Sequence, residues 1–140
     1  MSAPHRFEVR VYYEDTDFSG IVYHAAYLHY FERARTEFLR AIGVHHSELI
    51  ADGIAFAVRS MSIEFEAAAQ IDDMLEVVTA VESFSPVRLR LDQQIFRGDR
   101  VITRAKVLVV AIRAGGRPAR LPRALLARLA APAVPSESNP

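Results

Sequence analysis

The feature that most constrains the fold of this chain is one long amphipathic segment, residues 24–42. Its apolar side chains recur at helical spacing and form a continuous stripe of Tyr27, Phe31, Ala34, Phe38 and Ala41. On the opposite face, Glu37 is spaced to pair along a helix with Arg33 or Arg40. Gly43 follows and predicts where the helix ends. The fold must therefore be built around a single long helix.

Most other apolar segments have the pattern of β-strands. Residues 7–13 alternate apolar and polar side chains, which is typical of a half-buried strand. Runs rich in Val and Ile, separated by turn residues, follow the helix at 54–65, 74–84, 87–96 and 101–112. The sequence RGDR at 97–100 predicts a hairpin turn, and GGRP at 115–118 is expected to end the last strand.

The order of these elements predicts the fold class. One strand, one helix and four further strands, without a second crossover helix, favour an α+β fold in which an antiparallel five-stranded sheet packs on the long helix. Strands such as 105–112 are apolar on both faces, so we expect a second subunit to cover what the helix leaves exposed. Residues 1–131 are expected to form a single domain that ends in a short helix at 121–131, and residues 132–140 a disordered tail.

Composition narrows the cellular setting and the partners. The chain has no cysteine, no signal-peptide pattern and no run of about 20 apolar residues, so we expect a cytoplasmic protein without a membrane span. Residues 1–85 hold 6 Lys/Arg and 14 Asp/Glu, a balance of −8, whereas residues 86–140 hold 11 and 3, a balance of +8. The basic half either meets an anionic ligand or pairs with the acidic half. Its cations lie mainly on strands and turns without interleaved aromatics, which argues against nucleic acid.

Reactive side chains are densest around the start of the long helix. The polar run EDTDFSG at 14–20 predicts a loop, and His24 stands where the helix begins. Free N–H groups and the positive dipole end of a helix stabilise developing negative charge there. A carboxylate such as Asp17 would supply a base or nucleophile, and this pairing suits acyl transfer from a thioester. The alternative is that Asp15 and Asp17 only cap the helix and form Asx-turns.

A family resemblance favours the catalytic interpretation. The run YYEDTDFSGIVYHAAYLHYFERARTEFLRAIG at 12–43 closely resembles the hotdog-fold acyl-CoA thioesterases of the 4-hydroxybenzoyl-CoA thioesterase group, especially the branch associated with the Tol-Pal envelope system. Weaker similarity continues through 55–65, 71–77 and 117–122. The resemblance implies a hotdog fold, a sheet wrapped around the helix. It also implies hydrolysis of small to medium acyl-CoA thioesters to free acid and CoA, without a cofactor or metal.

The resemblance also implies roles for particular residues. Asp17 matches the catalytic carboxylate, acting as nucleophile through a mixed anhydride or as general base on water. Gly20 matches the glycine that allows close backbone approach, and the backbone N–H of His24 or its neighbour matches the oxyanion donor. The His24 side chain and Tyr13 match active-site positions of the Tol-Pal branch. From the residues alone, each has an alternative interpretation: His24 as a histidine at the start of the helix, and Tyr13 as a core residue.

Substrate and subunit contacts are implied in the same way. Val22 and Tyr23 are expected to contact substrate beside Gly20, and Val58, Arg59 and Ser60 to line the acyl pocket from the opposite subunit of a dimer or dimer-of-dimers (homotetramer). Arg88 and Arg90 share one strand face and are the candidates for the CoA phosphates. The neighbouring runs EAAAQ at 66–70 and SPVR at 85–88 depart from the commoner family residues. The thioester partner is CoA or, alternatively, an acyl carrier protein.

Other functions were weighed on the same residues. One alternative is a hotdog dehydratase or hydratase of 3-hydroxyacyl thioesters, against which the DTDxxG loop argues. The other is a non-catalytic acyl-binding or scaffold subunit linked to envelope lipid metabolism, against which the intact set of Asp17, Gly20 and His24 argues. His45, His46 and Glu48 favour a solvated connector over a metal site, because adjacent histidines point apart. His29 and Glu32 are interpreted as surface or interface residues, since a di-metal bundle needs its motif on a second helix.

Overall fold

A computed structural model describes residues 3–131 of the chain. Its sheet is antiparallel, with the strand order β1-β3-β4-β5-β2 and a short β6 paired to β5. The elements are β1 (His5–Arg10), α1 (His24–Ala41), α2 (His46–Ala51), β2 (Ile54–Phe65), β3 (Met74–Phe84), β4 (Leu89–Arg97), β5 (Arg100–Arg113), β6 (Arg117–Ala119) and α3 (Arg123–Ala130). Two 3-10 turns, η1 (Tyr13–Asp15) and η2 (Ala114–Gly116), complete the order. The predicted tail at 132–140 lies outside the described residues.

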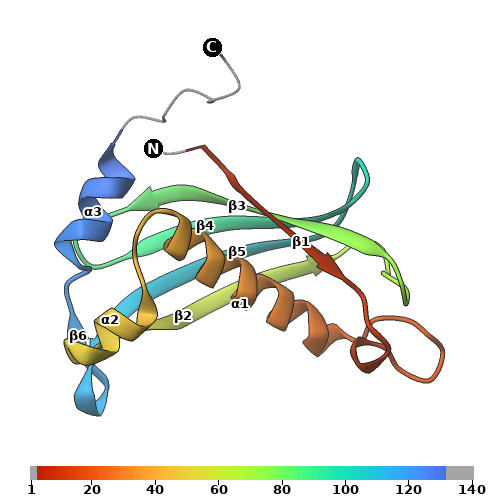
Figure 1. Cartoon of the computed structure of the whole chain (residues 1–140), viewed down its shortest axis with the longest axis horizontal. Helices are drawn as coiled ribbons and strands as arrows, with labels where there is room; N and C mark the ends of the chain where they lie inside the picture. The colour runs from red at the N-terminus through yellow and green to blue at the C-terminus, as the bar shows by residue number, and fades with distance from the viewer. Residues whose placement is uncertain (1–2, 132–140) are drawn as a thin grey trace.

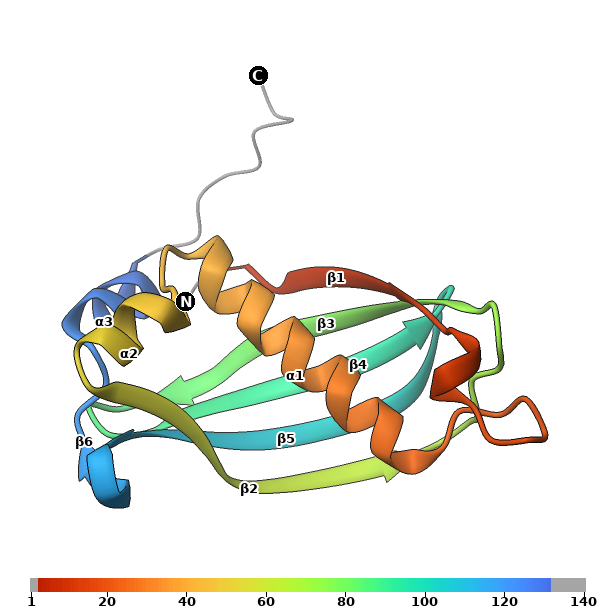
Figure 2. The ribbon, with the colours of Figure 1, turned by 60° about the horizontal axis from the view of Figure 1, so that its bottom comes forward.

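The sheet curves around α1, which crosses one face of it (Figure 1). β1 and β2 form the two outer edges of the strand order, with β3, β4 and β5 between them. The loop before α1 and the connection between β2 and β3 meet at one end of the molecule, whereas α2, α3 and β6 gather at the other (Figure 2). This arrangement confirms the predicted α+β class and the sheet wrapped around one long helix.

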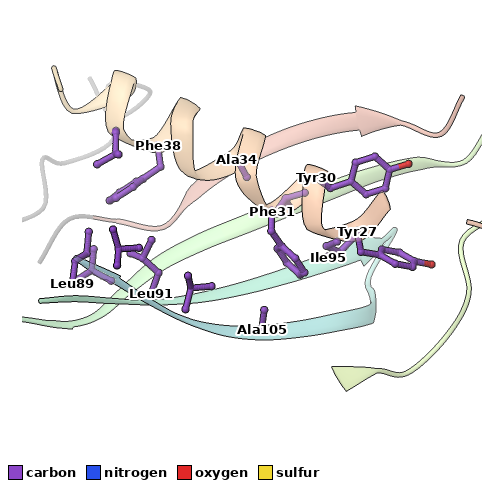
Figure 3. Close-up of a cluster of buried hydrophobic side chains, with 14 of the residues drawn as sticks. Tyr27, Tyr30, Phe31, Ala34, Phe38, Leu89, Leu91, Ile95 and Ala105 are labelled. Carbon is purple, nitrogen blue, oxygen red and sulfur yellow. The ribbon is translucent and has the colours of Figure 1, made fainter. Parts of the chain in front are cut away.

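The core lies between α1 and the concave face of the sheet. Tyr27, Phe31, Ala34 and Phe38 are buried as the helical stripe predicted, and they face Leu89, Leu91 and Ile95 (Figure 3). Burying each large apolar side chain contributes about 1.5–3 kcal/mol. The buried stripe is wider than predicted, because the curved sheet reaches both flanks of the helix and also buries Tyr30 and Leu39. Ala41, at the end of the predicted stripe, is exposed.

The expected course of the first strand is wrong at its end. β1 stops at Arg10, and Val11 then pairs with the β2–β3 connection, its N–H donating to the Asp73 carbonyl at 2.9 Å. The chain next turns through η1, so the alternation does not reach Tyr13, whose side chain is 76% exposed. Tyr13 is therefore not a core residue of this chain.

Two further predictions of loop structure need correction. The connector after Gly43 contains α2, in which Leu49 is buried and the His46 ring packs edge-on against Phe56 at a centroid distance of 5.6 Å. GGRP does end β5, but its last residues form the added strand β6. The RGDR hairpin is confirmed, with Arg97 paired to Arg100.

The opposite charges of the two halves partly neutralise each other across the sheet. Arg97 pairs with Asp73, Arg104 with Glu66, and Lys106 with Glu82. Each pair joins a cation of the second half to a carboxylate of the first. Several arginines of the second half have no carboxylate within 4.0 Å among residues 3–131, and Arg88 and Arg120 are two of them. Both predicted uses of the basic half are therefore open to it.

Candidate active site

The loop that carries Asp17 folds as a small hairpin before α1. Thr16 pairs with Val22, the Asp17 N–H donates to the Ile21 carbonyl at 2.9 Å, and the Tyr23 N–H donates to the Asp15 carbonyl at 3.3 Å. Asp17 thus lies near the tip of the hairpin, and its base leads directly into the helix. Asp17 is two residues along the hairpin from the Asp15–Tyr23 pair at its base, roughly 7 Å of extended backbone.

The turn of this hairpin depends on a glycine. Gly20 adopts a φ of +83°, a left-handed conformation that other residues adopt at a steric cost. Its N–H donates to the Asp17 carbonyl at 3.0 Å, and its own carbonyl accepts from the Ile71 N–H at 3.1 Å. Gly20 therefore closes the turn around Asp17 and also ties it to the β2–β3 connection.

Asp17 is fully exposed, and Ser19 holds its carboxylate. The Oδ1 atom accepts from the Ser19 N–H at 2.9 Å and from the Ser19 hydroxyl at 2.5 Å. These hydrogen bonds lower the pKa of the Asp17 carboxyl, so the group is ionised at neutral pH. The contact to Ser19 is an Asx-turn, which was the predicted alternative to a catalytic role for Asp17. Because an ionised carboxylate can also attack a carbonyl or accept a proton from water, the turn and the catalytic role are compatible.

The start of α1 offers the donors that an oxyanion needs. Tyr23 is the N-cap in an extended conformation without a capping side chain, and the first turn contains no acidic residue. Among residues 3–131, the His24 and Ala25 N–H groups have no backbone acceptor, whereas the Ala26 N–H donates to the Tyr23 carbonyl at 3.0 Å. The positive end of the helix is thus left open beside Asp17.

The side chains predicted around this helix start differ in their exposure. The His24 ring stacks on Phe65 at the end of β2, with a centroid distance of 4.5 Å. Tyr13 and Tyr23 are exposed, whereas Val22 is buried and its N–H is bound to the Ala69 carbonyl. His24, Tyr13 and Tyr23 can therefore contact a substrate, which stays a prediction for each.

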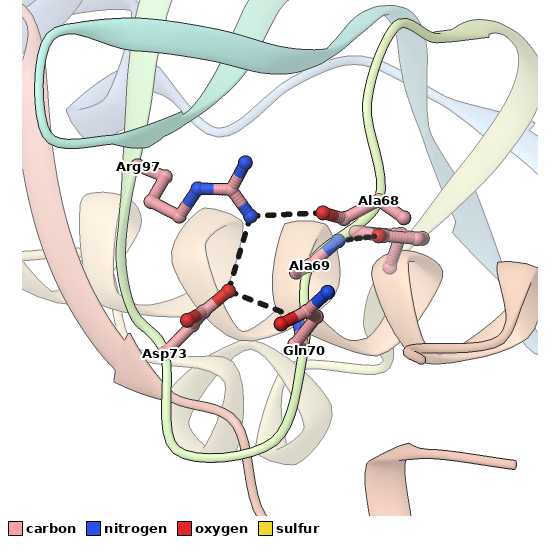
Figure 4. Close-up of polar contacts among 6 residues, drawn as sticks. Ala68, Ala69, Gln70, Asp73 and Arg97 are labelled. Carbon is pink, nitrogen blue, oxygen red and sulfur yellow. Dashed lines mark hydrogen bonds and ion pairs between the residues drawn. The ribbon is translucent and has the colours of Figure 1, made fainter. Parts of the chain in front are cut away.

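The segment that anchors the loop is itself held by a charged residue. Arg97 Nη1 donates to the Ala68 carbonyl at 2.8 Å and to Asp73 Oδ2 at 3.1 Å, and the same carboxylate oxygen accepts from the Gln70 N–H at 2.9 Å (Figure 4). Between these points, the Ala69 carbonyl accepts from the Val22 N–H at 2.9 Å. The position of the loop thus depends on Arg97 at the far end of β4, a contact that sequence reasoning did not identify.

The predicted acyl-pocket residues lie far from Asp17 within one chain. Val58, Arg59 and Ser60 are exposed around a bulge in the middle of β2. Phe65, which stacks on His24, lies seven positions after Val58 along the strand, roughly 20 Å at the usual rise of an extended chain. One chain alone therefore does not bring these residues to its own Asp17.

Three cavities adjoin this part of β2. On one side, Arg59 and Arg88 line a cavity of about 540 Å³ together with Arg120, over an apolar floor that includes Val110 and Ile112. Arg90 lines the third of them, a cavity of about 260 Å³, with Ser60, Lys106 and Glu82. Arg88 lies just before β4 and Arg90 lies within it, so the two predicted CoA contacts are not both on the strand, and they line different cavities. Arg120 was missed, although it belongs to the run RPARLP that carries part of the resemblance.

The second cavity, of about 370 Å³, lies between α1 and strands β2, β4 and β5. Val58 lines it, together with Arg35 of α1. Arg35 falls between the buried Phe31 and Phe38 on the helix, a spacing that could have indicated its position beside the core.

Residues 3–131 contain no helix that is long and apolar enough to cross a membrane. Within the same residues, three or more His, Cys, Asp or Glu side chains never come together as a metal site would require. His45 is the N-cap of α2, and His46 and Glu48 lie within that helix. His29 and Glu32 are exposed residues of α1.

Comparison with known proteins decides the family. Residues 11–129 match the model of the Thioesterase-like superfamily. The chain belongs to this superfamily. It is therefore a thioester hydrolase, and the resemblance seen in its sequence is confirmed.

Members with similar sequences span nearly the same length as this thioesterase. The acyl-CoA thioester hydrolase YbgC of Escherichia coli O6:H1 is 43% identical over 124 residues, which cover 87% of this chain and 92% of that protein. The acyl-CoA thioesterase YbgC of Haemophilus influenzae is 42% identical over 110 residues, covering 78% and 81%. The crystal structure of a probable thioesterase from Bartonella henselae superposes with a TM-score of 0.82 at 44% identity, covering 86% of this chain and all of that one.

Proposed function

We propose that this thioesterase hydrolyses small to medium acyl-CoA thioesters to free acid and CoA, with Asp17 as the catalytic carboxylate. The observation that carries the proposal is the pairing of an ionised, exposed Asp17 with the uncapped start of α1 on one small hairpin. The similarity to the acyl-CoA thioester hydrolase of Escherichia coli and the acyl-CoA thioesterase of Haemophilus influenzae supports acyl-CoA as the substrate. A carrier-protein thioester is the alternative acyl donor.

The proposed mechanism uses the two ends of the hairpin together. The thioester carbonyl binds at the first turn of α1, where the His24 or Ala25 N–H donates to its oxygen. Attack by the Asp17 carboxylate, or by a water that gives its proton to Asp17, produces a tetrahedral oxyanion that these donors stabilise by about 3–4 kcal/mol. The carbon–sulfur bond then breaks, and the CoA thiolate leaves and is protonated. In the nucleophilic route, water hydrolyses the resulting mixed anhydride.

The remaining predicted residues require a second subunit. β2 is an edge strand of twelve residues, and such a long exposed edge normally pairs or is covered. Antiparallel pairing of two β2 strands would place the Phe65 end of one beside the Val58 half of the other. Each Asp17 loop would then approach the Val58 cavity and the arginine cavity of its partner. We propose a homodimer of this kind, and its pairing into a homotetramer stays a prediction.

In this dimer the CoA phosphates bind the arginine cavity. Arg59, Arg88 and Arg120 present three guanidinium groups, which bind phosphate in a bidentate way. The apolar floor of the cavity suits the adenine ring. Arg90 is less suited to the phosphates. Lys106, the other cation of the Arg90 cavity, is already paired with Glu82 and Asp92. A cytoplasmic location and the Tol-Pal association that the resemblance implied belong to the same proposal.

Hydrolysis of a panel of acyl-CoA thioesters, followed with a thiol-reactive dye, tests the function. Asp17→Asn keeps the shape of the side chain but removes the charge, and it should lower kcat/KM by about 10²-fold or more. Asp99→Asn, in the exposed β4–β5 turn, is the matched control and should match wild type. If wild type hydrolyses no thioester, an acyl-binding subunit replaces the enzyme, and if an enoyl thioester accumulates, the chain is a dehydratase. Equal activity of wild type and Asp17→Asn would leave Asp17 as a turn residue only.

A further inference from the structure

The cavity beside Val58 combines an apolar wall with one partly buried cation, Arg35. Its volume of about 370 Å³ lies within the range of small-molecule sites. Its apolar lining consists of Leu39, Ala57, Phe56, Val58, Leu89, Leu91 and Val109. The polar side chains on its wall are Glu32, Arg35, Thr36 and His46. A hydrocarbon chain with a polar end would match such a lining.

Arg35 is held in place by a buried, uncharged network. Its Nη1 donates to Gln93 Oε1 at 3.0 Å. The Gln93 amide nitrogen donates to the Phe31 carbonyl at 3.1 Å and to Thr79 Oγ1 at 2.9 Å. Because both acceptors take up the nitrogen side, the Gln93 oxygen must face Arg35. Gln93 and Thr79 are fully buried, so the guanidinium is positioned before any ligand binds.

The charge of Arg35 lacks a counter-ion. Burial lowers the pKa of the guanidinium, an effect that Glu32 partly opposes, and the group nevertheless stays charged. Among residues 3–131, no carboxylate lies within 4.0 Å of it. Glu32 is exposed and also lines the groove on the other flank of α1, where Phe7 and Arg33 lie. A desolvated cation without an anion is costly, and a bound carboxylate would compensate it with two hydrogen bonds.

We propose that this cavity receives the distal end of the acyl group and that Arg35 selects acyl chains that end in a carboxylate. The inference rests on the proposed function, which places Val58 on the acyl path. The substrate class is therefore the CoA thioester of a dicarboxylic acid. CoA itself is less suited to this cavity, because its phosphates have three arginines available on the other side of β2.

Paired substrates of equal carbon number test the selection. Glutaryl-CoA is compared with pentanoyl-CoA, and adipoyl-CoA with hexanoyl-CoA, for wild type, Arg35→Met and Arg35→Lys. Wild type should favour the carboxylated member of at least one pair, and Arg35→Met should lower that preference about tenfold to a hundredfold, mainly through KM. Arg35→Lys keeps the charge and should retain part of the preference. Arg33→Met, on the same helix but outside the cavity, is the control and should leave the preference unchanged.

Binding of free adipate, measured by calorimetry on the same folded variants, separates this inference from the proposed function. Binding that Arg35→Met weakens and Arg33→Met does not supports the inference, even if no thioester is hydrolysed. If alkyl thioesters are hydrolysed but the preference of wild type is absent or is the same in Arg35→Met, the inference is overturned and the function stands. If Arg35→Met unfolds, the test uses Arg35→Lys and Arg33→Met. Selection by Arg35 is overturned if wild type and both of these variants show the same substrate preference and the same affinity for adipate.

Discussion

Two buried tyrosines on α1 give a matched test of how the catalytic loop is anchored. Tyr27 and Tyr30 lie side by side, with ring centroids 6.1 Å apart, and both are almost completely buried. The Tyr27 hydroxyl accepts from the Ala69 N–H at 2.9 Å, and Ala69 is fully buried. The Tyr30 hydroxyl makes no hydrogen bond of ordinary geometry among the described residues, although after burial the nearby Asp15 carboxylate also raises its pKa. Replacing each by phenylalanine removes the same atom in two different situations.

The expected magnitudes follow from these contacts. Tyr27→Phe leaves the buried Ala69 N–H without an acceptor, which costs about 1–3 kcal/mol of unfolding free energy. For a chain of 140 residues, about 2 kcal/mol corresponds to a fall in Tm of roughly 7 °C. Tyr30→Phe breaks no hydrogen bond of ordinary geometry and removes only a hydroxyl near the Asp15 carboxylate, so it should cost less stability than Tyr27→Phe. Because the Ala69 carbonyl holds Val22, Tyr27→Phe should also lower kcat more than Tyr30→Phe does.

Denaturant unfolding and thermal melting at one fixed protein concentration measure both effects, since the melting of an oligomer depends on concentration. The reasoning is refuted if the two variants lose equal stability. It is also refuted if Tyr27→Phe is as stable and active as wild type, because the Ala69 N–H then finds another acceptor at no cost. A loss for Tyr30→Phe alone would mean that its hydroxyl, and not that of Tyr27, holds the loop.

Two further predictions concern the acid limb of the reaction and the arginine cavity. In the proposed mechanism ionised Asp17 is the active form, and its pKa is lowered, so kcat/KM should hold down to a pH below the ordinary aspartate value of about 3.9 and fall as Asp17 is protonated. Ser19→Ala removes the main cause of the lowered pKa, so the fall of kcat/KM at acidic pH should shift to higher pH in a pH–rate profile. If the fall does not shift, it reports the protonation of another group. Arg88→Met and Arg120→Met should each raise KM about tenfold for acyl-CoA but not for acyl-N-acetylcysteamine, which lacks the phosphates. Arg90→Met is the control, and an equal effect on both thioesters in steady-state kinetics would remove the phosphates from this cavity.

Much of the fold was predictable because, in long segments, the pattern of apolar residues indicates which side chains are buried. The stripe from Tyr27 to Phe38 depends on local spacing and the long strands on runs rich in Val and Ile, and both are confirmed. The short elements were not predictable in this way. α2 has six residues and β6 has three, too few for a period to be recognised. Tyr13 continued the alternation in sequence, whereas the chain had already turned at Tyr12.

The candidate site divides along the same line. The polar loop and the helix start are contiguous in sequence, so Asp17, Gly20 and His24 could be singled out without a structure. Arg97, Gln93 and Arg120 act through contacts with residues distant along the chain, for example Gln93 with Phe31, 62 positions away. No local pattern marks such residues. The dependence of the loop on the connection between β2 and β3 is visible only once the strands are paired.

The arrangement of the site along the chain has a consequence for how such enzymes diversify. The hairpin and the first turn of α1 occupy one uninterrupted stretch, whereas most residues around the Val58 cavity and the arginine cavity lie on β2, β4, β5 and β6. A change in a strand can therefore alter which thioester fits while the reacting groups stay untouched. The first part of the chain carries the proposed reacting groups, and cavity-lining strand positions can change with the substrate, provided that residues such as Arg97, which hold the loop, are kept.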